Sequence, residues 1–280
     1  MRRCLTIAGS DSGGGAGIQA DLKTFSVFQV YGLSVLTAIT AQNTLGVQGV
    51  ETLPPDFIAL QIRSVLSDIG ADAGKTGMLA TKAIVEVVAA GLREFHLPSL
   101  VVDPVMVSAT GHRLLDEDAV EAIKTLLFPL ATVVTPNLAE ATILCGEKVE
   151  DLDGMKEAAK AIKALDPRTV LVKGGHLAGP RIYDVLYDGE HFEVWDAPKI
   201  ATEHTHGSGC TLSAAITAGL AKGHSVWEAV DTAQRYLHAA IQTAIKIGKG
   251  KGPVNHLVKV DLSGIRSPTA KIDRKKGPPR

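Results

Sequence analysis

Residues 202–211 (TEHTHGSGCT) combine the residue types in this chain that are best suited to chemistry. Two glycines, Gly207 and Gly209, flank Ser208, and Cys210 follows directly before a predicted helix of small and apolar residues. Backbone N–H groups at a helix start lack intrahelical partners and lie in the positive field of the helix dipole, so they bind anions. The same field lowers the pKa of a cysteine, so Cys210 could act as a thiolate, a base or a nucleophile. An ordinary turn with a buried cysteine is the alternative.

Further polar residues follow three predicted strands. Asp103 comes after the strand at 100–102, Asn137 and Glu140 come after the next one, and Lys173 precedes two glycines. Ligands of open α/β sheets bind beyond the carboxyl ends of the strands, where these side chains would meet. Carboxylates suit Mg²⁺, and a lysine with N–H groups suits phosphate. Taken singly, Asn137 could be only a helix cap and Glu140 the second half of a capping box. Their joint placement favours a site.

A glycine-rich segment at residues 9–21 (GSDSGGGAGIQAD) follows the first predicted strand and opens a helix. It is not a dinucleotide-binding motif, because G-x-G-x-x-G read from Gly13 would need glycine where Ile18 stands, and the chain has no G-x-x-x-x-G-K-[ST]. The glycines allow a ligand to approach the backbone closely, and Asp21 is a candidate hydrogen-bond acceptor. The alternative is a surface aspartate.

Two further residues suit a heterocycle. Gln42 follows the strand predicted at 35–40, and its amide offers both a donor and an acceptor to a ring edge. Met78 follows Gly77 and could form an apolar wall for a ring. A loop glutamine and a core methionine are the alternatives, and for Met78 alone the core interpretation is favoured.

Short apolar segments that alternate with longer helical patterns must position these residues. The pattern predicts an α/β domain with a largely parallel sheet. The predicted strands are 5–8, 35–40, 73–76, 100–102, 133–135, 170–173 and a hairpin-like pair at 184–187 and 192–195. The predicted helices are 16–30, 56–68, 81–95, 116–127, 138–145, 155–165, 211–222 and 225–246.

Composition places the chain among ordinary globular proteins, with 280 residues, 45% hydrophobic and 21% charged. A formal net charge of −1 predicts no general attraction to nucleic acid or to an anionic membrane. The apolar run at the N-terminus is too short for a signal peptide, and no stretch is long enough for a membrane span. The three cysteines lack a C-x-x-C spacing, which favours a reducing cytoplasm over a disulfide framework or a zinc site.

Without an internal repeat or a linker, residues 1–256 are predicted to form a single domain. Residues 257–280 differ, because their lysines and arginines outnumber their aspartates and several prolines interrupt them. This segment is predicted to be a basic, poorly ordered tail, and a partner-binding arm is the less common alternative.

Eight motifs are distributed along most of the chain. GSDSGGGAGIQADLKTF, TAITAQNT, KTGML, VVDPVM, TPNLAEA, VLVKGGH, THGSGCTLSAAI and GKGKGPVNH occur between residue 9 and about residue 256. In this order they resemble the hydroxymethylpyrimidine/phosphomethylpyrimidine kinases of thiamine biosynthesis, within the ribokinase-like superfamily. The resemblance implies a three-layer α/β/α sandwich with a mostly parallel mixed sheet, usually dimeric. It also implies ATP-dependent phosphorylation of 4-amino-5-hydroxymethyl-2-methylpyrimidine and then of its monophosphate. No thiamine-phosphate synthase segment follows, so a stand-alone kinase is expected.

The same resemblance assigns roles to the candidate residues. It implies that Gln42 binds the pyrimidine, with Asp21, Gly9, Met78 and Val105 around the ring. It implies that the nucleotide contacts Asn137, Lys173, Thr205 and Gly209, that Asp103 and Glu140 lie in the Mg²⁺ and ATP region, and that Gly207, Ser208, Gly209 and Cys210 form an anion hole. Much of the superfamily has aspartate as the base where this chain has Cys210. Threonine is frequent where Ser208 stands, and the change should matter little because the backbone N–H binds.

The expected mechanism is in-line phosphoryl transfer, with Cys210 taking the proton from the hydroxymethyl group and Lys173 and Mg²⁺ balancing charge. A pyridoxal or pyridoxine kinase of the same branch is the nearest alternative, since that ring also carries a hydroxymethyl group. A nucleotide-sensing regulator without catalysis, using the basic tail to contact a partner, is an alternative of another class.

Overall fold

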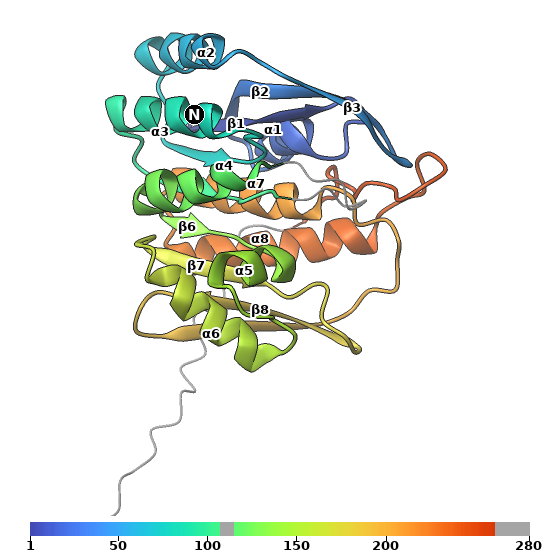
Figure 1. Ribbon diagram of the computed structural model, residues 1–280. Helices are drawn as coiled ribbons and strands as arrows, with labels where there is room; N and C mark the ends of the chain where they lie inside the picture. The colour runs from blue at the N-terminus through green and yellow to red at the C-terminus, as the bar shows by residue number, and fades with distance from the viewer. Residues whose placement is uncertain (107–114, 261–280) are drawn as a thin grey trace, which may run out of the picture.

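The computed structural model describes residues 1–106 and 115–260, which form one mixed sheet with helices on both faces (Figure 1). Within these residues the sheet has the strand order β3-β2-β1-β4-β5-β6-β7-β8-β9. Pairing is parallel from β2 to β7 and antiparallel for β3, β8 and β9. The strands are β1 Arg3–Asp11, β2 Tyr31–Asn43, β3 Gly46–Thr52, β4 Ala73–Thr76, β5 Leu100–Val102, β6 Val133–Val134, β7 Thr169–Lys173, β8 Arg181–Tyr187 and β9 Phe192–Pro198.

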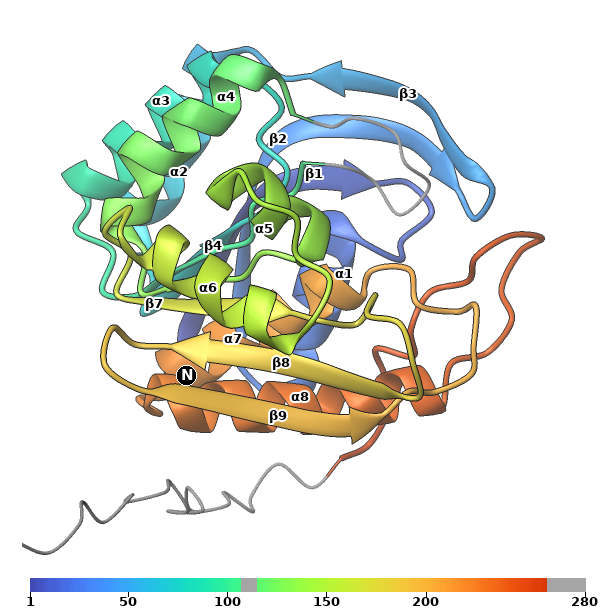
Figure 2. The same cartoon turned by 60° about the horizontal axis from the view of Figure 1, so that its bottom comes forward.

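The helices form two layers, one on each face of the sheet (Figures 1 and 2). One core joins the sheet to α2 Pro55–Asp68, α3 Lys82–Glu94, α4 Glu117–Ala122, α5 Leu138–Cys145 and α6 Leu152–Lys163. The other core joins it to α1 Gly17–Val27, α7 Ser208–Ala221 and α8 Val226–Gln242. The predicted three-layer α/β/α sandwich with a mostly parallel mixed sheet is therefore confirmed.

Side chains of β4 alternate between the two layers, because successive residues of a strand point to opposite faces. Ala73 packs in the core beneath α7 and α8, together with Val101 of the neighbouring strand. Lys75, two residues after Ala73, points to the same face and is completely buried. A charged side chain thus lies in the layer that contains α1 and α7.

Three elements have the predicted bounds, namely the strands at 73–76 and 100–102 and the helix at 138–145. The helix predicted at 211–222 begins earlier, at Ser208, so Cys210 lies inside its first turn. The helix predicted at 116–127 is α-helical only to Ala122 and continues as a π-turn.

Strand β3 was missed by the sequence prediction. Its sequence, GVQGVET, has two glycines and no apolar alternation, and most of its residues are exposed. It is held instead by antiparallel pairing with β2, which extends beyond the predicted strand at 35–40. An edge strand without a buried face gives no hydrophobic signal in the sequence.

The predicted tail begins with residues that contact the body of the protein. Val258 and Val260 pack against the core formed by α7 and α8, and Leu257 is exposed. Residues 261–280, the remainder of that prediction, lie outside the described residues. In the described part of the chain, no helix combines the length and apolarity needed to cross a bilayer.

Candidate active site

The loop before α7 closes against the glycine-rich loop after β1. Gly207 is the N-cap of α7 and has φ +80°, a backbone conformation that favours glycine. A Cβ at this position would lie 1.8 Å from the carbonyl oxygen of Gly15. Glycine is therefore required both by the backbone angle and by the contact.

The start of α7 offers backbone donors as the sequence predicted, although not all of them. The first helical bond runs from Thr211 N–H to the Gly207 carbonyl (2.9 Å), so the N–H groups of Gly209 and Cys210 precede helical bonding. Ser208 N–H instead donates to the carbonyl of Thr205 (3.1 Å), and Thr205 is itself exposed. An anion at this helix start would meet the N–H groups of Gly209 and Cys210 first.

A buried ion pair lies beside this helix start. Lys173 Nζ, at the end of β7, is 2.9 Å from Asp103 Oδ1 after β5. Asp103 also accepts hydrogen bonds from Thr135 (3.2 Å) and Ser213 (3.0 Å). A Cβ on Gly209 would lie 3.3 Å from Lys173 Nζ, so the ammonium group is next to the first turn of α7. The structure brings Lys173, Asp103 and Gly209 together, as the topology predicted.

The electrostatics of Asp103 follow from these contacts. Burial alone would raise the pKa of this carboxyl, but the charges of Lys173 and Lys75 and the hydrogen bonds hold it below its usual value. The carboxylate stays ionised, and the pKa of Lys173 is raised by Asp103 and Glu140 against the opposing effect of burial.

Asn137 and Glu140 form a capping box at the start of α5. This was one of the two interpretations of the pair, and a ligand site was the other. Asn137 Oδ1 accepts from the Glu140 backbone N–H (3.0 Å), and Glu140 Oε2 accepts from the Asn137 backbone N–H (2.8 Å). Burial raises the pKa of Glu140 to about 7, with Lys173 lowering it and Asp103 raising it further. Glu140 is thus a buried carboxyl group that a nearby cation would favour in its ionised form.

Asp103 and Glu140 are carboxylates, the kind of hard oxygen ligand that suits Mg²⁺. The described residues contain no cluster of three or more His, Cys, Asp or Glu side chains able to hold a metal by themselves. Mg²⁺ bound with a nucleotide needs only one or two carboxylates, since phosphate oxygens and waters complete its octahedron. The charge of Asp103 raises the pKa of Glu140 and the charge of Lys173 lowers it, so both charged groups act on the Glu140 carboxyl.

Cys210 differs from the expectation of a lowered pKa. Burial raises the pKa of the thiol to about 11, Lys75 lowers it, and Asp21 and Asp103 raise it again. The backbone N–H of Gly17, the first residue of α1, also bonds to Cys210 and favours the thiolate. The helix field alone would lower the thiol pKa, but the loss of solvent at this position outweighs that field.

Three of the residues assigned to the ring lie together on the β1–β2 side of the sheet. Met78 and Val105 belong to one small apolar cluster with Ala38 and Ala80. A Cβ on Gly9 would lie 3.3 Å from the sulfur of Met78, so the backbone at Gly9 borders this cluster directly. Met78 is buried, which agrees with its interpretation as a core residue.

Asp21 has no surface for a ligand in this structure. Its side chain is completely buried, Oδ1 lies 2.8 Å from Lys75 Nζ, and Oδ2 accepts from Thr6 Oγ1 (2.7 Å). Both carboxylate oxygens are therefore engaged inside the α1 layer. Sequence reasoning could not find this arrangement because Lys75 lies on a strand whose other residues are apolar or small.

Gln42 lies at the end of β2, close to two residues that sequence reasoning missed. Its Oε1 accepts from Thr40 Oγ1 (3.2 Å), and its Nε2 is 3.4 Å from His206 Nε2. His206 Nε2 is also 2.9 Å from Asp11 Oδ2, which leaves this ring nitrogen as a donor to the carboxylate.

Asp11 organises the glycine-rich loop. Its Oδ1 accepts from Gly13 N–H (2.8 Å), and its Oδ2 accepts from Gly15 (3.0 Å) and Ala16 (2.8 Å). The S-D-S-G-G-G sequence carries the signal of an aspartate that caps its own turn. Burial raises the pKa of Asp11, but the hydrogen bonds from His206 and from the backbone outweigh burial and lower it.

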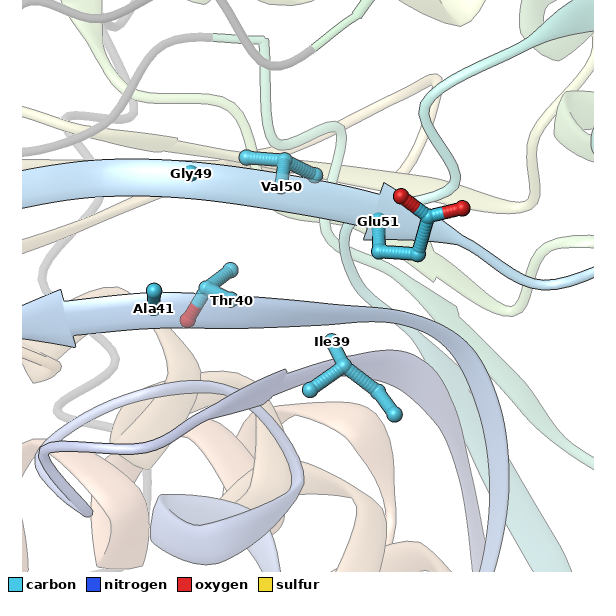
Figure 3. A pocket seen from close by; sticks show the side chains of 6 residues that line it. All are labelled: Ile39, Thr40, Ala41, Gly49, Val50 and Glu51. Atoms are coloured by element: carbon cyan, nitrogen blue, oxygen red, sulfur yellow. The ribbon is translucent and has the colours of Figure 1, made fainter.

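A hollow on the β2–β3 hairpin borders these residues through Thr40, whose hydroxyl donates to Gln42. It is lined by Ile39, Thr40, Ala41, Gly49, Val50 and Glu51 (Figure 3). None of the residues that carry the predicted chemistry lines it, and its lining is mostly apolar.

The sequence and the structure were compared with those of known proteins. A family model described as phosphomethylpyrimidine kinase matches residues 11–255. A hydroxymethylpyrimidine/phosphomethylpyrimidine kinase from Streptomyces coelicolor is 51% identical over 252 residues, which cover 90% of this chain and 93% of that protein. The thiamine biosynthesis bifunctional protein of Geobacter sulfurreducens is 49% identical over 92% of this chain, which spans only about half (52%) of that longer relative. The structure of pyridoxal kinase from Staphylococcus aureus with AMP-PCP and pyridoxal is similar to this chain, with a TM-score of 0.85 and 40% identity, and the match covers 91% of this chain and 94% of that chain.

Proposed function

The chain belongs to the phosphomethylpyrimidine kinase family, with the ribokinase-like fold, and from this we propose a two-step activity. It transfers the γ-phosphoryl group of ATP to the hydroxymethyl group of 4-amino-5-hydroxymethyl-2-methylpyrimidine. It then phosphorylates the resulting monophosphate to the pyrophosphate used in thiamine biosynthesis. Both steps are ATP-dependent phosphotransferase reactions at one site.

The observation that carries this proposal is the convergence at the start of α7. Backbone donors of Gly209 and Cys210 lie beside the Lys173–Asp103 pair, with Glu140 next to it. Phosphoryl transfer asks a protein mainly to hold the groups in line and to neutralise charge, and these groups do both. The apolar cluster of Met78 and Val105 and the amide of Gln42 lie on the glycine-loop side of this centre.

In the first step the Cys210 thiolate takes the proton of the substrate hydroxymethyl group as the hydroxymethyl oxygen bonds to the γ-phosphorus, and the bond from that phosphorus to the bridging oxygen breaks so that ADP leaves. Because burial raises the thiol pKa to about 11, only about one thiol in ~10⁴ is ionised at pH 7. The thiolate that does form is a strong base. The N–H groups of Gly209 and Cys210 bind the transferring phosphoryl group, and Lys173 balances its charge.

We propose that Mg²⁺ is held by Asp103 and Glu140 together with the nucleotide phosphates, on which it neutralises charge when bound. Asn137 and Thr205 complete the nucleotide side in this proposal. Asp103 has a second task, because its contact with Lys173 fixes the ammonium group beside the helix start. In the second step the acceptor is a phosphate that is already ionised, so Cys210 matters less there.

A second candidate is phosphorylation of pyridoxal. The specific observation in its favour is the Staphylococcus aureus pyridoxal kinase, which is 40% identical to this chain and matches it over 91% of its length. The same hydroxymethyl acceptor geometry serves both rings, so the two activities are compatible with one site.

We also propose that residues 1–256 act as one domain in a cytoplasmic homodimer. Support for the dimer comes from Ile39 and Val50, exposed apolar side chains that line the hollow on the β2–β3 hairpin (Figure 3). Support for the cytoplasm comes from the three cysteines, none of which is in a disulfide.

The test is ADP release by the purified chain with ATP, Mg²⁺ and one acceptor at a time: the pyrimidine alcohol, its monophosphate, pyridoxal or pyridoxine. ADP release with the first two is expected. Cys210→Ala should lose about 10²–10⁴-fold of the first rate while nucleotide binding persists. Cys145→Ala, on α5, is the matched control and should leave both rates unchanged. Absence of ADP with every acceptor would instead favour a regulator.

A further inference from the structure

A lysine and an aspartate form a completely buried ion pair that the proposed chemistry does not use. Lys75 Nζ of β4 lies 2.8 Å from Asp21 Oδ1 of α1, and both side chains are 0% exposed. Thr6 Oγ1 of β1 donates to the second carboxylate oxygen (2.7 Å). Buried pairs of this kind often add little stability over apolar side chains of the same volume, so stability does not explain why this one is here.

The pair lies in the layer that also contains α7, the helix that carries the thiol of Cys210. Lys75 points into the layer of α1 and α7, because it shares its strand face with Ala73 in the core beneath α7. A Cβ on Gly77 would lie 3.8 Å from Lys75 Nζ, which places the ammonium group at the carboxyl end of β4. The thiol of Cys210 is at this same end, in the first turn of α7.

Helix α1 connects the two features. Gly17, its first residue, donates its N–H to Cys210. Asp21 is four residues later, so it lies on the same face of α1, one turn below Gly17. The sulfur, the helix start and the Lys75–Asp21 pair are therefore stacked along one face of a single helix.

Four charged groups act on the thiol from the surrounding elements. Lys75 of β4 and Lys173 of β7 favour the thiolate, and Asp21 of α1 and Asp103 after β5 oppose it. Among these charges Lys75 has the largest effect on Cys210. The ammonium group itself stays charged, because Asp21, Cys210 and Asp103 raise its pKa against the effect of burial.

We propose that Lys75 is a positioning residue for Cys210: its buried ammonium group supplies the positive charge that balances the thiolate during the first transfer. Asp21 keeps that ammonium group charged and fixed, and Thr6 fixes Asp21. The role assigned to Asp21 changes accordingly, from a ring contact to a counter-ion. The catalytic role of Lys75 rests on the proposed function. The effect of its charge on the ionisation of Cys210 can be measured without turnover.

The experiment measures the rate at which iodoacetamide alkylates Cys210 between pH 7 and 10, with the modified peptide quantified by mass spectrometry. Lys75→Met keeps the volume and removes the charge, so alkylation at pH 9 should slow by about tenfold, which corresponds to one pKa unit. Asp21→Asn removes the opposing charge and should accelerate alkylation. Cys145 of α5, on the opposite face of the sheet, is an internal reference in every sample.

The two substitutions should change the alkylation rate of Cys210 in opposite directions, which distinguishes an effect of charge from a loosened core. If the pair were only structural, both substitutions would loosen the core and both would accelerate alkylation of Cys210, which would overturn the proposal. Should either single variant fail to fold, the double variant Lys75→Met with Asp21→Asn leaves no unpaired buried charge. Because Lys75 acts on the thiol more strongly than Asp21, the double variant should alkylate more slowly than the wild type, and an equal or faster rate contradicts the proposal.

The activity assay keeps the two claims apart. If Cys210→Ala retains full turnover, the base in the proposed function is wrong, whatever the alkylation rates show. If Cys210→Ala loses turnover and Lys75→Met changes neither alkylation nor the pH profile of the first transfer, the positioning role is wrong and the proposed function stands.

Discussion

Replacing Gly207 by alanine should disable phosphoryl transfer while the protein stays folded. Two effects arise at this position. The φ of +80° is strained for any L-residue, which costs about 1 kcal/mol. The new Cβ would also lie 1.8 Å from the Gly15 carbonyl oxygen, whereas ordinary contacts begin near 3.4 Å. The loop before α7 must therefore move by more than about 1 Å, and displacements of that size can reduce a rate by ~10²-fold.

Gly223→Ala provides the matched control. Gly223 has φ +89° after the last turn of α7, and nothing lies within 4 Å of its Cβ position. Both variants share the backbone strain, which should lower each melting temperature by about 2–4 °C, and the overlap with Gly15 should lower that of Gly207→Ala further. Only Gly207→Ala has the additional contact with Gly15.

The assay is ADP release with the pyrimidine alcohol, together with thermal unfolding followed by circular dichroism. We expect kcat to fall about 100-fold for Gly207→Ala and to stay near the wild-type value for Gly223→Ala. A folded Gly207→Ala protein with kcat within threefold of the wild type would refute the reasoning, because it would show that the loop position is not needed for transfer.

Two further predictions concern pH. The first-step kcat/KM should rise up to tenfold per pH unit between pH 7 and 9, because the Cys210 pKa of about 11 makes the thiolate population of the free enzyme increase throughout that range. A flat profile, or the same rise in Cys210→Ala, would contradict this. Burial raises the pKa of Glu140 in the folded protein to about 7, from about 4.5 in the unfolded chain. The free energy of unfolding therefore falls as the pH rises from 4.5 through 7, and the whole decrease is present above pH 7. In thermal melts at pH 5 and pH 8, Glu140→Gln should remove that decrease in the free energy of unfolding. The same variant should raise the Mg²⁺ concentration needed for half-maximal activity. An unchanged Mg²⁺ dependence would remove Glu140 from the metal site.

The sequence predicted the layers and the edge of the sheet where the chemistry lies, because these depend on patterns that are local in the chain. Buried strands such as 100–102 (LVV) and 170–173 (VLVK) read as short, mostly apolar runs, and their carboxyl ends identify Asp103 and Lys173. Strand β3 was missed because an exposed edge strand has no apolar face.

Pairings between distant residues could not be predicted in this way. Asp21 and Lys75 read singly as a helix-face carboxylate and a strand lysine, and only the packing of α1 on β4 joins them. The Asp11–His206 contact likewise spans the length of the chain. For Cys210 the local signal even had the wrong sign, since the helix field is local and visible in sequence, whereas burial depends on the whole fold.

The order in which the chain leaves the ribosome gives the loop before α7 a further significance. Its partners are Asp11 and Gly15 near the beginning of the chain, and Gly252, whose carbonyl accepts from His206 N–H, near the end of the domain. Val254 N–H donates back to the His206 carbonyl (3.2 Å). A nascent chain can thus complete most of its sheet while this loop still lacks its last partner. Phosphotransfer should begin only when about 254 residues are free to fold, late in synthesis rather than gradually.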